Sequence, residues 1–122
     1  MKGETKMAYN IPVEATLDVI GGKWKVVIMC HLIKGEKRTS ELKKLMPVIT
    51  QKMLTQQLRE LEADGVVNRT VYDQVPPKVV YSLTEYGWSL RPILDAMCCW
   101  GEKHIALTSE EIANCSIDSP SA

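Results

Sequence analysis

Few residues of this chain have the types and the spacing that catalysis or metal binding requires. Cys30 and His31 would need to meet as nucleophile and base, but neighbouring side chains on a helix point about 100° apart. Cys98, Cys99 and His104 lack the CxxC-type spacing of zinc sites and a fourth ligand. No glycine-rich phosphate loop or nucleophile elbow occurs. We therefore expect no enzyme activity, no metal and no cofactor.

The four cysteines indicate a reducing compartment. Cys30, Cys98, Cys99 and Cys115 show neither paired spacing nor a disulfide framework, which favours free thiols. The first ten residues lack the apolar stretch of a signal peptide. No apolar run approaches the roughly 20 residues that cross a bilayer. We expect a cytoplasmic protein without a membrane partner.

One polar helix face has the chemistry to bind nucleic-acid bases. Leu54, Leu58 and Leu61 recur at helical spacing and predict the buried side of this helix. Glutamine pairs with adenine through two hydrogen bonds, and arginine or lysine pairs with guanine. The opposite face holds Lys52, Gln56, Arg59 and Ala63, Thr55 flanks it, and Thr50 and Gln51 lie at the N-terminal end, which enters a major groove first.

The alternative interpretation is that this face is polar only because water surrounds it, as on most amphipathic helices. The order of charges favours base reading. Glu60, Glu62 and Asp64 gather at the C-terminal end of the helix, although the helix dipole disfavours acids there. The net charge of the chain is zero, but residues 23–78 carry eleven Lys or Arg against six Asp or Glu. This basic middle segment predicts a surface that meets phosphates.

The 122 residues suffice for one domain, and the patterns around the polar helix predict a helix-turn-helix followed by a β-hairpin. Helices are expected over 12–20 and 23–34, with Trp24 in the core, and a third helix is expected between a Ser40 cap and Pro47. Thr50 caps the polar helix, which ends at Asp64-Gly65. Residues 67–83 predict a wing, flanked by Arg69 and Lys78 for phosphate or minor-groove contact, and a brief strand is expected over 37–39.

The C-terminal third predicts further helices. We expect Thr84 to cap a helix that runs through Trp100 with a bend at Pro92, and Thr108 to begin a last short helix. The order of elements gives a mainly α fold with a small β-hairpin, a winged helix-turn-helix. The expected divisions are a flexible N-terminus over 1–10, a DNA-binding and dimerisation domain over 11–107, and a short terminal helix and tail over 108–122.

Apolar residues on the terminal helices predict a homodimer, because a small winged domain leaves them uncovered. A two-fold axis would place two polar helices about 34–36 Å apart, so the operator is expected to be an inverted repeat. The expected dimer residues are Val13, Leu17, Leu90, Leu94, Met97 and Trp100.

Several motifs, in this order and spacing, resemble the HxlR-type regulators, a winged-helix family related to the MarR group. They are Ile20-Gly21-Gly22-Lys23-Trp24, Ser40-Glu41-Leu42, the run from Leu54 to Arg69, Val71-Tyr72, Val75-Pro76-Pro77, Tyr81-Ser82-Leu83-Thr84 and Gly87. The resemblance covers roughly residues 11–104. It implies a MarR-like fold that dimerises through its terminal helices, with two winged helices on a partly palindromic operator. The resemblance is also compatible with a small-molecule inducer as a partner.

These observations predict a sequence-specific regulator of transcription, a repressor, that binds double-stranded DNA. The expected DNA-binding residues are Ser40, Thr50, Gln51, Lys52, Thr55, Gln56, Arg59, Arg69 and Lys78. Two alternatives stay open: a winged-helix module that binds proteins instead of DNA, and a thiol-responsive regulator with a non-standard cysteine. In several members of the family a cysteine just before the proline of the first helix senses oxidants, but Ile11 stands at that place here.

Overall fold

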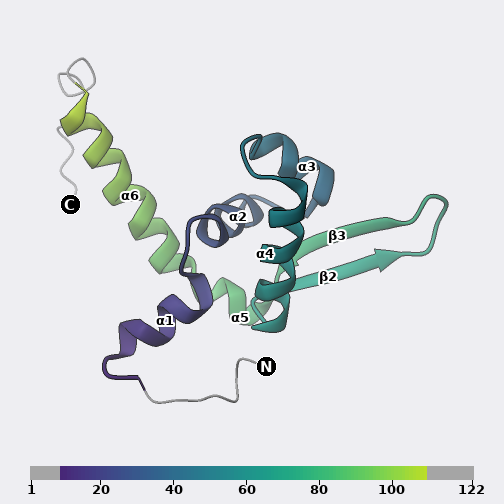
Figure 1. The fold of residues 1–122 in the computed structure, drawn as a ribbon, viewed down its shortest axis with the longest axis horizontal. Helices are drawn as coiled ribbons and strands as arrows, with labels where there is room; N and C mark the ends of the chain where they lie inside the picture. The colour runs from purple at the N-terminus through teal and green to yellow at the C-terminus, as the bar shows by residue number, and fades with distance from the viewer. Residues whose placement is uncertain (1–8, 110–122) are drawn as a thin grey trace. The chain divides into compact units, whose positions relative to one another are not determined.

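The computed structural model describes residues 9–109, which divide into two compact units after Leu90. Figure 1 shows the order of the elements. The first unit contains α1 (Pro12–Ile20), α2 (Trp24–Ile33), β1 (Lys37–Arg38), α3 (Thr39–Leu45), α4 (Gln51–Ala63), β2 (Val67–Tyr72), β3 (Lys78–Leu83) and α5 (Glu85–Trp88), and the second contains α6 (Arg91–Thr108). The expectations for residues 1–8 and 110–122 lie outside the described residues.

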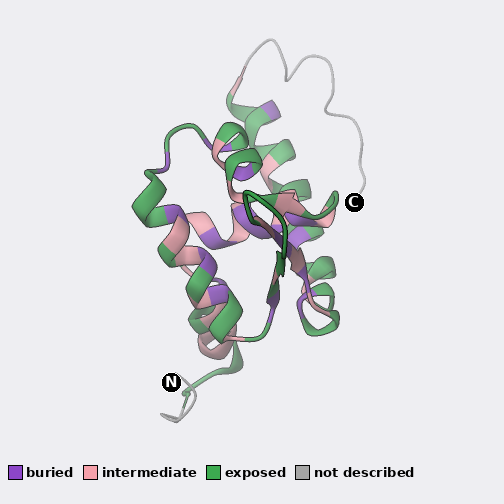
Figure 2. Ribbon diagram, turned by 90° about the vertical axis from the view of Figure 1, so that its right-hand side faces the viewer, coloured by how far each residue is buried: buried purple, intermediate pink, exposed green. Residues whose placement is uncertain are grey.

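The core of the first unit is built from α2, α3, α4 and buried residues of the hairpin, and Figure 2 shows the buried positions in purple. The stripe predicted for α4 is confirmed, because Leu54, Leu58 and Leu61 are all fully buried. Trp24 is not a core anchor: it is only half-buried, and the Lys23 ammonium lies 4.7 Å from its ring centroid. The interior positions of α2 belong instead to residues later in the helix, including Ile28, Met29 and Leu32.

The predicted wing is confirmed as the antiparallel hairpin of β2 and β3, which projects beyond the helices in Figure 1. The strand order is β1-β3-β2, so β3 is central. The brief strand expected over 37–39 is present but shorter, because only Lys37 and Arg38 pair with β3 and Thr39 already begins α3. The peptide bond between Val75 and Pro76, in the tip of the wing, is cis.

Two of the three expected caps are confirmed. The Met53 N–H donates to the Thr50 hydroxyl at 3.0 Å at the start of α4, and the Gly87 N–H donates to Thr84 at 2.9 Å at the start of α5. The cap assigned to Ser40 is wrong, because α3 begins at Thr39 and Arg38 is its N-cap residue. The carboxylate of Glu41 accepts the Arg38 N–H at 2.8 Å, so this carboxylate satisfies a backbone donor at the helix start.

A single helix from Thr84 through Trp100 is also wrong, because α5 ends at Trp88 and α6 starts at Arg91. Pro92 therefore lies in the first turn of α6, where its missing N–H leaves no helical hydrogen bond unmade, so the physical reason for the expected bend does not apply. Thr108 is the last residue of α6, and its hydroxyl lies within hydrogen-bond distance of the carbonyls of His104 and Ile105. The last short helix predicted beyond it lies outside the described residues.

A hydrogen-bonded corner joins the end of α4 to the start of the wing and to α5. Gly65 follows the end of α4 and has a φ of +79°, the left-handed conformation that a glycine just after a helix commonly adopts. The sequence predicted this role for Gly65. The Thr84 hydroxyl donates to the Gly65 carbonyl at 2.7 Å, and the Thr84 N–H donates to the Val66 carbonyl at 3.1 Å. A Cβ at Gly87 would lie 2.1 Å from the Val66 oxygen, so only glycine allows this close approach.

Candidate nucleic-acid interface

The exposed face of α4 collects most of the predicted base-reading residues. Lys52, Gln56 and Arg59 are exposed, as the helical spacing predicts, because the leucine stripe opposite them is buried. The Gln51 side-chain amide lies 3.5 Å from the Thr55 hydroxyl one turn later. A shallow hollow on this face is lined by Gln51, Lys52, Thr55, Gln56 and Arg59. Thr50 lies just before it and is engaged as the helix cap.

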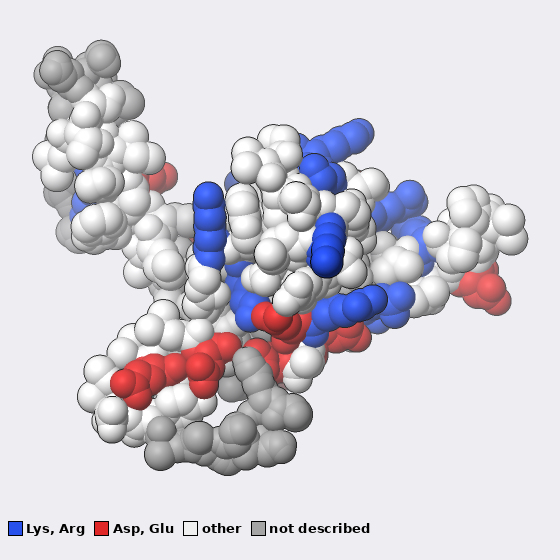
Figure 3. Space-filling model, in the orientation of Figure 1, with Lys and Arg blue, Asp and Glu red and all other residues white. Residues whose placement is uncertain are grey.

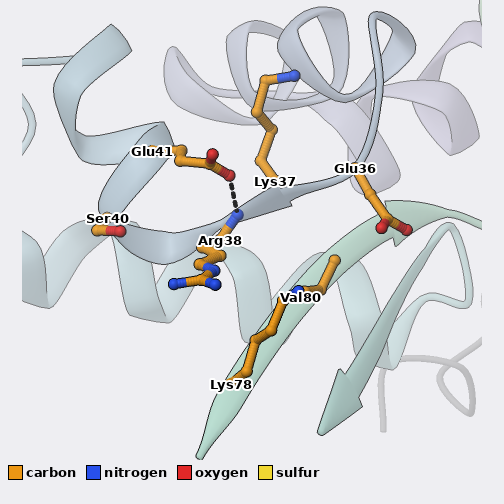
Figure 4. Close-up of a pocket in the computed structure, with 7 residues that line it drawn as sticks. All are labelled: Glu36, Lys37, Arg38, Ser40, Glu41, Lys78 and Val80. Atoms are coloured by element: carbon orange, nitrogen blue, oxygen red, sulfur yellow. Dashed lines mark hydrogen bonds between the residues drawn. The ribbon is translucent and has the colours of Figure 1, made fainter. Parts of the chain in front are cut away.

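A polar cleft of about 420 Å³ lies between β1, the start of α3 and β3. It brings together two predicted residues, Ser40 and Lys78, with one that sequence reasoning missed, Arg38. In Figure 4 the Arg38 side chain extends toward β3, whereas Lys37 extends to the other side of β1. The remaining lining residues are Glu36, Lys37, Glu41 and Val80. Arg38 escaped prediction because a two-residue strand has no periodicity from which the direction of its side chains can be read.

The wing adds two cations. Arg69 is exposed on β2, opposite Tyr81 of β3. Lys78 begins β3, and its ammonium lies 5.2 Å from the centroid of the Tyr72 ring, within the range of a cation–π contact. Neither side chain lines the hollow on α4, so the structure places the wing cations apart from the predicted base-reading residues.

Positive and negative side chains occupy different regions of the first unit. In Figure 3, positive side chains project over the region of α3, α4 and the base of the hairpin. Negative side chains gather at the lower end of α4 in that view and along α1. The exposed face of α4 itself carries two of the cations, Lys52 and Arg59. A polyanion would be attracted to the positive region of this unit.

An ion pair that sequence reasoning missed connects the interior to α4. Lys25 of α2 is buried, and its ammonium lies 2.6 Å from Oε1 of Glu60. The other carboxylate oxygen of Glu60 accepts the Gln56 side-chain N–H at 3.2 Å. A lysine within a largely apolar helix was the only sequence signal for this pair, and the helical pattern of α4 assigned Glu60 merely to an acidic helix end.

Another titratable group, His31, lies on α2. Burial lowers the pKa of the His31 imidazole below its usual value, and repulsion from the ammonium groups of Lys34 and Lys37 lowers it further. His31 is therefore held in its neutral form more strongly than a histidine in water.

The apolar residues expected at a dimer interface differ in their exposure. Val13 and Leu17 on α1 are about half exposed, at 52% and 57%. On α6, Trp100 is 67% exposed and Met97 47%, and the Trp100 ring stacks on His104 at a centroid distance of 5.1 Å. Leu94 is fully buried within the single chain, and Leu90 is half-buried. Four of the six expected residues thus present apolar surface.

The cysteines within the described residues are thiols. Cys98 and Cys99 are exposed on α6, and Cys30 is half-buried on α2. Among residues 9–109, no group of three or more His, Cys, Asp or Glu side chains is placed to hold a metal ion. No helix in the same part of the chain has the length and apolar character of a membrane span. The prediction for Cys115 concerns a residue outside this part.

Comparison with known proteins gives consistent matches. The family model described as HxlR-like helix-turn-helix matches residues 19–109. The HTH-type transcriptional regulator YtcD of Bacillus subtilis is 75% identical over 100 residues, which cover 82% of this chain and 79% of that protein. The solved structure of the redox regulator HypR in its reduced form is 58% identical, with a TM-score of 0.77 over 82% of this chain and 99% of that one. A MarR-family transcriptional regulator from Enterococcus faecalis is 36% identical, with a TM-score of 0.71 over 88% of this chain and 98% of its own. The predicted winged, MarR-like fold is thereby confirmed, and the chain belongs to the HxlR-like helix-turn-helix family of transcriptional regulators.

Proposed function

We propose that this regulator binds a specific double-stranded DNA sequence and represses transcription as a homodimer in the cytoplasm. The observation that carries the proposal is the hollow on α4, where Gln51, Lys52, Thr55, Gln56 and Arg59 form one exposed surface. These side chains supply the donors and acceptors that distinguish base pairs in a major groove. The buried leucine stripe on the opposite side fixes the direction in which they point.

The cleft and the wing supply contacts to the DNA backbone in this proposal. Arg38, Ser40 and Lys78 lie around one cleft, where two cations and a hydroxyl can approach a phosphate. Arg69, exposed on β2, reaches a neighbouring phosphate or the minor groove. Such contacts fix the register of the protein on the duplex, whereas α4 reads the sequence.

The homodimer is supported by the exposed apolar side chains of α1 and α6. Val13, Leu17, Met97 and Trp100 leave apolar surface in water that a second copy of the chain would cover. A two-fold dimer implies two half-sites about 34–36 Å apart in an inverted repeat. Sedimentation measurements on wild type and on Trp100→Glu test this step: the wild type is expected as a dimer, and a monomeric wild type would refute it.

The decisive experiment has two steps, selection of DNA from a random duplex pool and measurement of affinity at several salt concentrations. Affinity should fall steeply with salt, because each cation on a phosphate releases counterions. The Lys52→Ala, Gln56→Ala, Arg59→Ala triple variant should lose sequence preference. Arg38→Ala should instead weaken binding to all sequences and reduce the salt slope by about one.

The control is Lys103→Ala, which removes one exposed cation from α6 and should leave DNA affinity unchanged. If the triple variant retains full sequence preference, then α4 does not read DNA. If the wild-type protein selects no DNA and shows no affinity that depends on salt, the winged-helix module that binds proteins becomes the better interpretation.

A thiol response is a second candidate function, favoured by the exposed thiols of Cys98 and Cys99 and by the likeness to the redox regulator HypR. Peroxide would oxidise two thiols to one disulfide, taking up their two protons and two electrons to form two water molecules. Replacement of all four cysteines by serine should then abolish any effect of peroxide on DNA affinity. An unchanged peroxide effect in that variant would exclude the cysteines as sensors.

A further inference from the structure

We infer that Glu60, held by the buried ammonium of Lys25, fixes the orientation of the Gln56 amide and makes Gln56 select adenine. The inference rests on the proposed reading of DNA by α4 and assigns one further specificity determinant to that helix. Lys25 and Glu60 are positioning residues in this scheme, because neither needs to touch DNA.

The structural basis is a chain of polar contacts from the interior to the reading face. Lys25 and Glu60 have 8% and 41% of their side-chain surface exposed, and the shortest distance between their charged groups is 2.6 Å. Glu60 uses its other oxygen for the Gln56 amide at 3.2 Å. A rotation of Glu60 away from this position would leave the Lys25 ammonium buried without this counter-charge, which is costly. The buried ammonium therefore holds the Glu60 carboxylate in place, whereas no such charge holds the carboxylate of an ordinary exposed i,i+4 pair.

The chemistry of the carboxylate determines which end of the amide it meets. A carboxylate only accepts hydrogen bonds, so it binds the NH₂ end of Gln56 and excludes the carbonyl end. The Gln56 carbonyl oxygen must then point away from Glu60, with the second N–H beside it. An unanchored glutamine can turn its amide over and exchange the two ends.

The orientation has a consequence for base selection. Adenine presents an N6 donor and an N7 acceptor in the major groove, which match the outward carbonyl and the second N–H of Gln56. Guanine presents two acceptors, O6 and N7, at the same edge. The outward carbonyl would face the guanine O6, and the two acceptors would repel. Gln56 held by Glu60 thus favours adenine over guanine.

The test compares affinities of the full chain for selected duplexes in which the position sensitive to Gln56→Ala carries either A·T or G·C. Glu60→Gln keeps the length of the side chain but can donate as well as accept, so it releases the Gln56 amide. We expect it to lower the preference for A·T by about tenfold, within the range of one bidentate contact. The matched control Glu62→Gln makes the same charge change on an exposed residue of α4 and should leave the preference unchanged.

Lys25→Met provides a second variant in case Glu60→Gln does not fold. It should also lower the preference for A·T over G·C. The NMR signals of the Gln56 side-chain NH₂ in DNA-free protein give a second readout. They should shift in Glu60→Gln and stay in place in Glu62→Gln.

Three results would overturn the inference. Unchanged A·T preference in a folded Glu60→Gln variant would refute it and leave DNA reading by α4 intact. Unchanged Gln56 NH₂ signals in the DNA-free Glu60→Gln variant would also refute the inference and leave DNA reading by α4 intact. A wild-type protein that binds no duplex would refute the proposed function together with the inference.

Discussion

The Lys25–Glu60 pair predicts an unequal cost of removing its two partners. The ammonium belongs to a side chain with 8% exposure, whereas the Glu60 side chain is 41% exposed. When Lys25 is replaced by Met, the remaining carboxylate can be hydrated, and the new side chain occupies the space of the lysine stem. When Glu60 is replaced by Met, an ammonium stays in the interior without its carboxylate. We therefore expect Glu60→Met to be the more destabilising change.

The magnitudes follow from these exposures. Removal of one partner from a fully buried pair costs about 3–5 kcal/mol, and the partial exposure of Glu60 lowers the expected cost of Glu60→Met to about 2–3 kcal/mol. Lys25→Met leaves the more exposed partner behind, so its cost should be close to that of an exposed pair, about 1 kcal/mol or less. The double variant should be no worse than Glu60→Met alone, because the uncompensated ammonium is gone.

Urea unfolding followed by circular dichroism measures these free energies at one pH and one protein concentration, because the proposed dimer would be stabilised by mass action. Glu62→Met is the matched control on α4, where the residue is exposed, and should change the unfolding free energy little. Equal costs for the two single variants, or a double variant whose cost is the sum of both, would refute the reasoning.

Three further predictions concern the fold. Gly87→Ala should destabilise the protein by about 3 kcal/mol in urea unfolding, because its Cβ would lie 2.1 Å from the Val66 oxygen; a cost near zero would contradict the close approach. Thr84→Ala should cost about 1–2 kcal/mol through loss of the cap and of the bond to Gly65, while Thr84→Ser should retain most of the stability. The pKa of His31 is lowered in the folded protein, so the unfolded chain binds a proton at this histidine more readily than the folded chain does. The contribution of neutral His31 to stability is therefore present above about pH 6.5 and is lost as the pH falls through the folded-state pKa. His31→Gln should make the urea midpoints at pH 7.5 and pH 5.5 more alike than in wild type, and an unchanged difference would show that other groups cause it.

Helical periodicity predicted the orientation of α4 because its signals agree with one another. The leucine stripe, the Thr50 cap and the Gly65 end all specify the same helix, and the structure follows each of them. Local patterns failed where a residue suits two positions. Pro92 was assigned to a bend within a helix, but a proline is equally compatible with the first turn, where the structure has it.

Contacts between elements were harder to predict than the elements. Lys25 and Glu60 lie on different helices, and no spacing rule within either helix pairs them. Arg38 reaches its cleft because β1 pairs with β3, far along the chain. Both cases depend on how elements pack, which a one-dimensional pattern does not record.

The two faces of α4 have a consequence for how such regulators diverge. Substitutions at Lys52 or Arg59 change exposed side chains and leave the leucine core untouched. Under the proposed reading of DNA by α4, new operator preferences can therefore arise there with little effect on folding. Gln56 is different, because it donates a hydrogen bond to Glu60, and Glu60 forms an ion pair with the buried Lys25. Evolutionary change in the contacts of Gln56 is therefore expected to accompany change at Glu60 and Lys25, so that the three positions vary together among descendants.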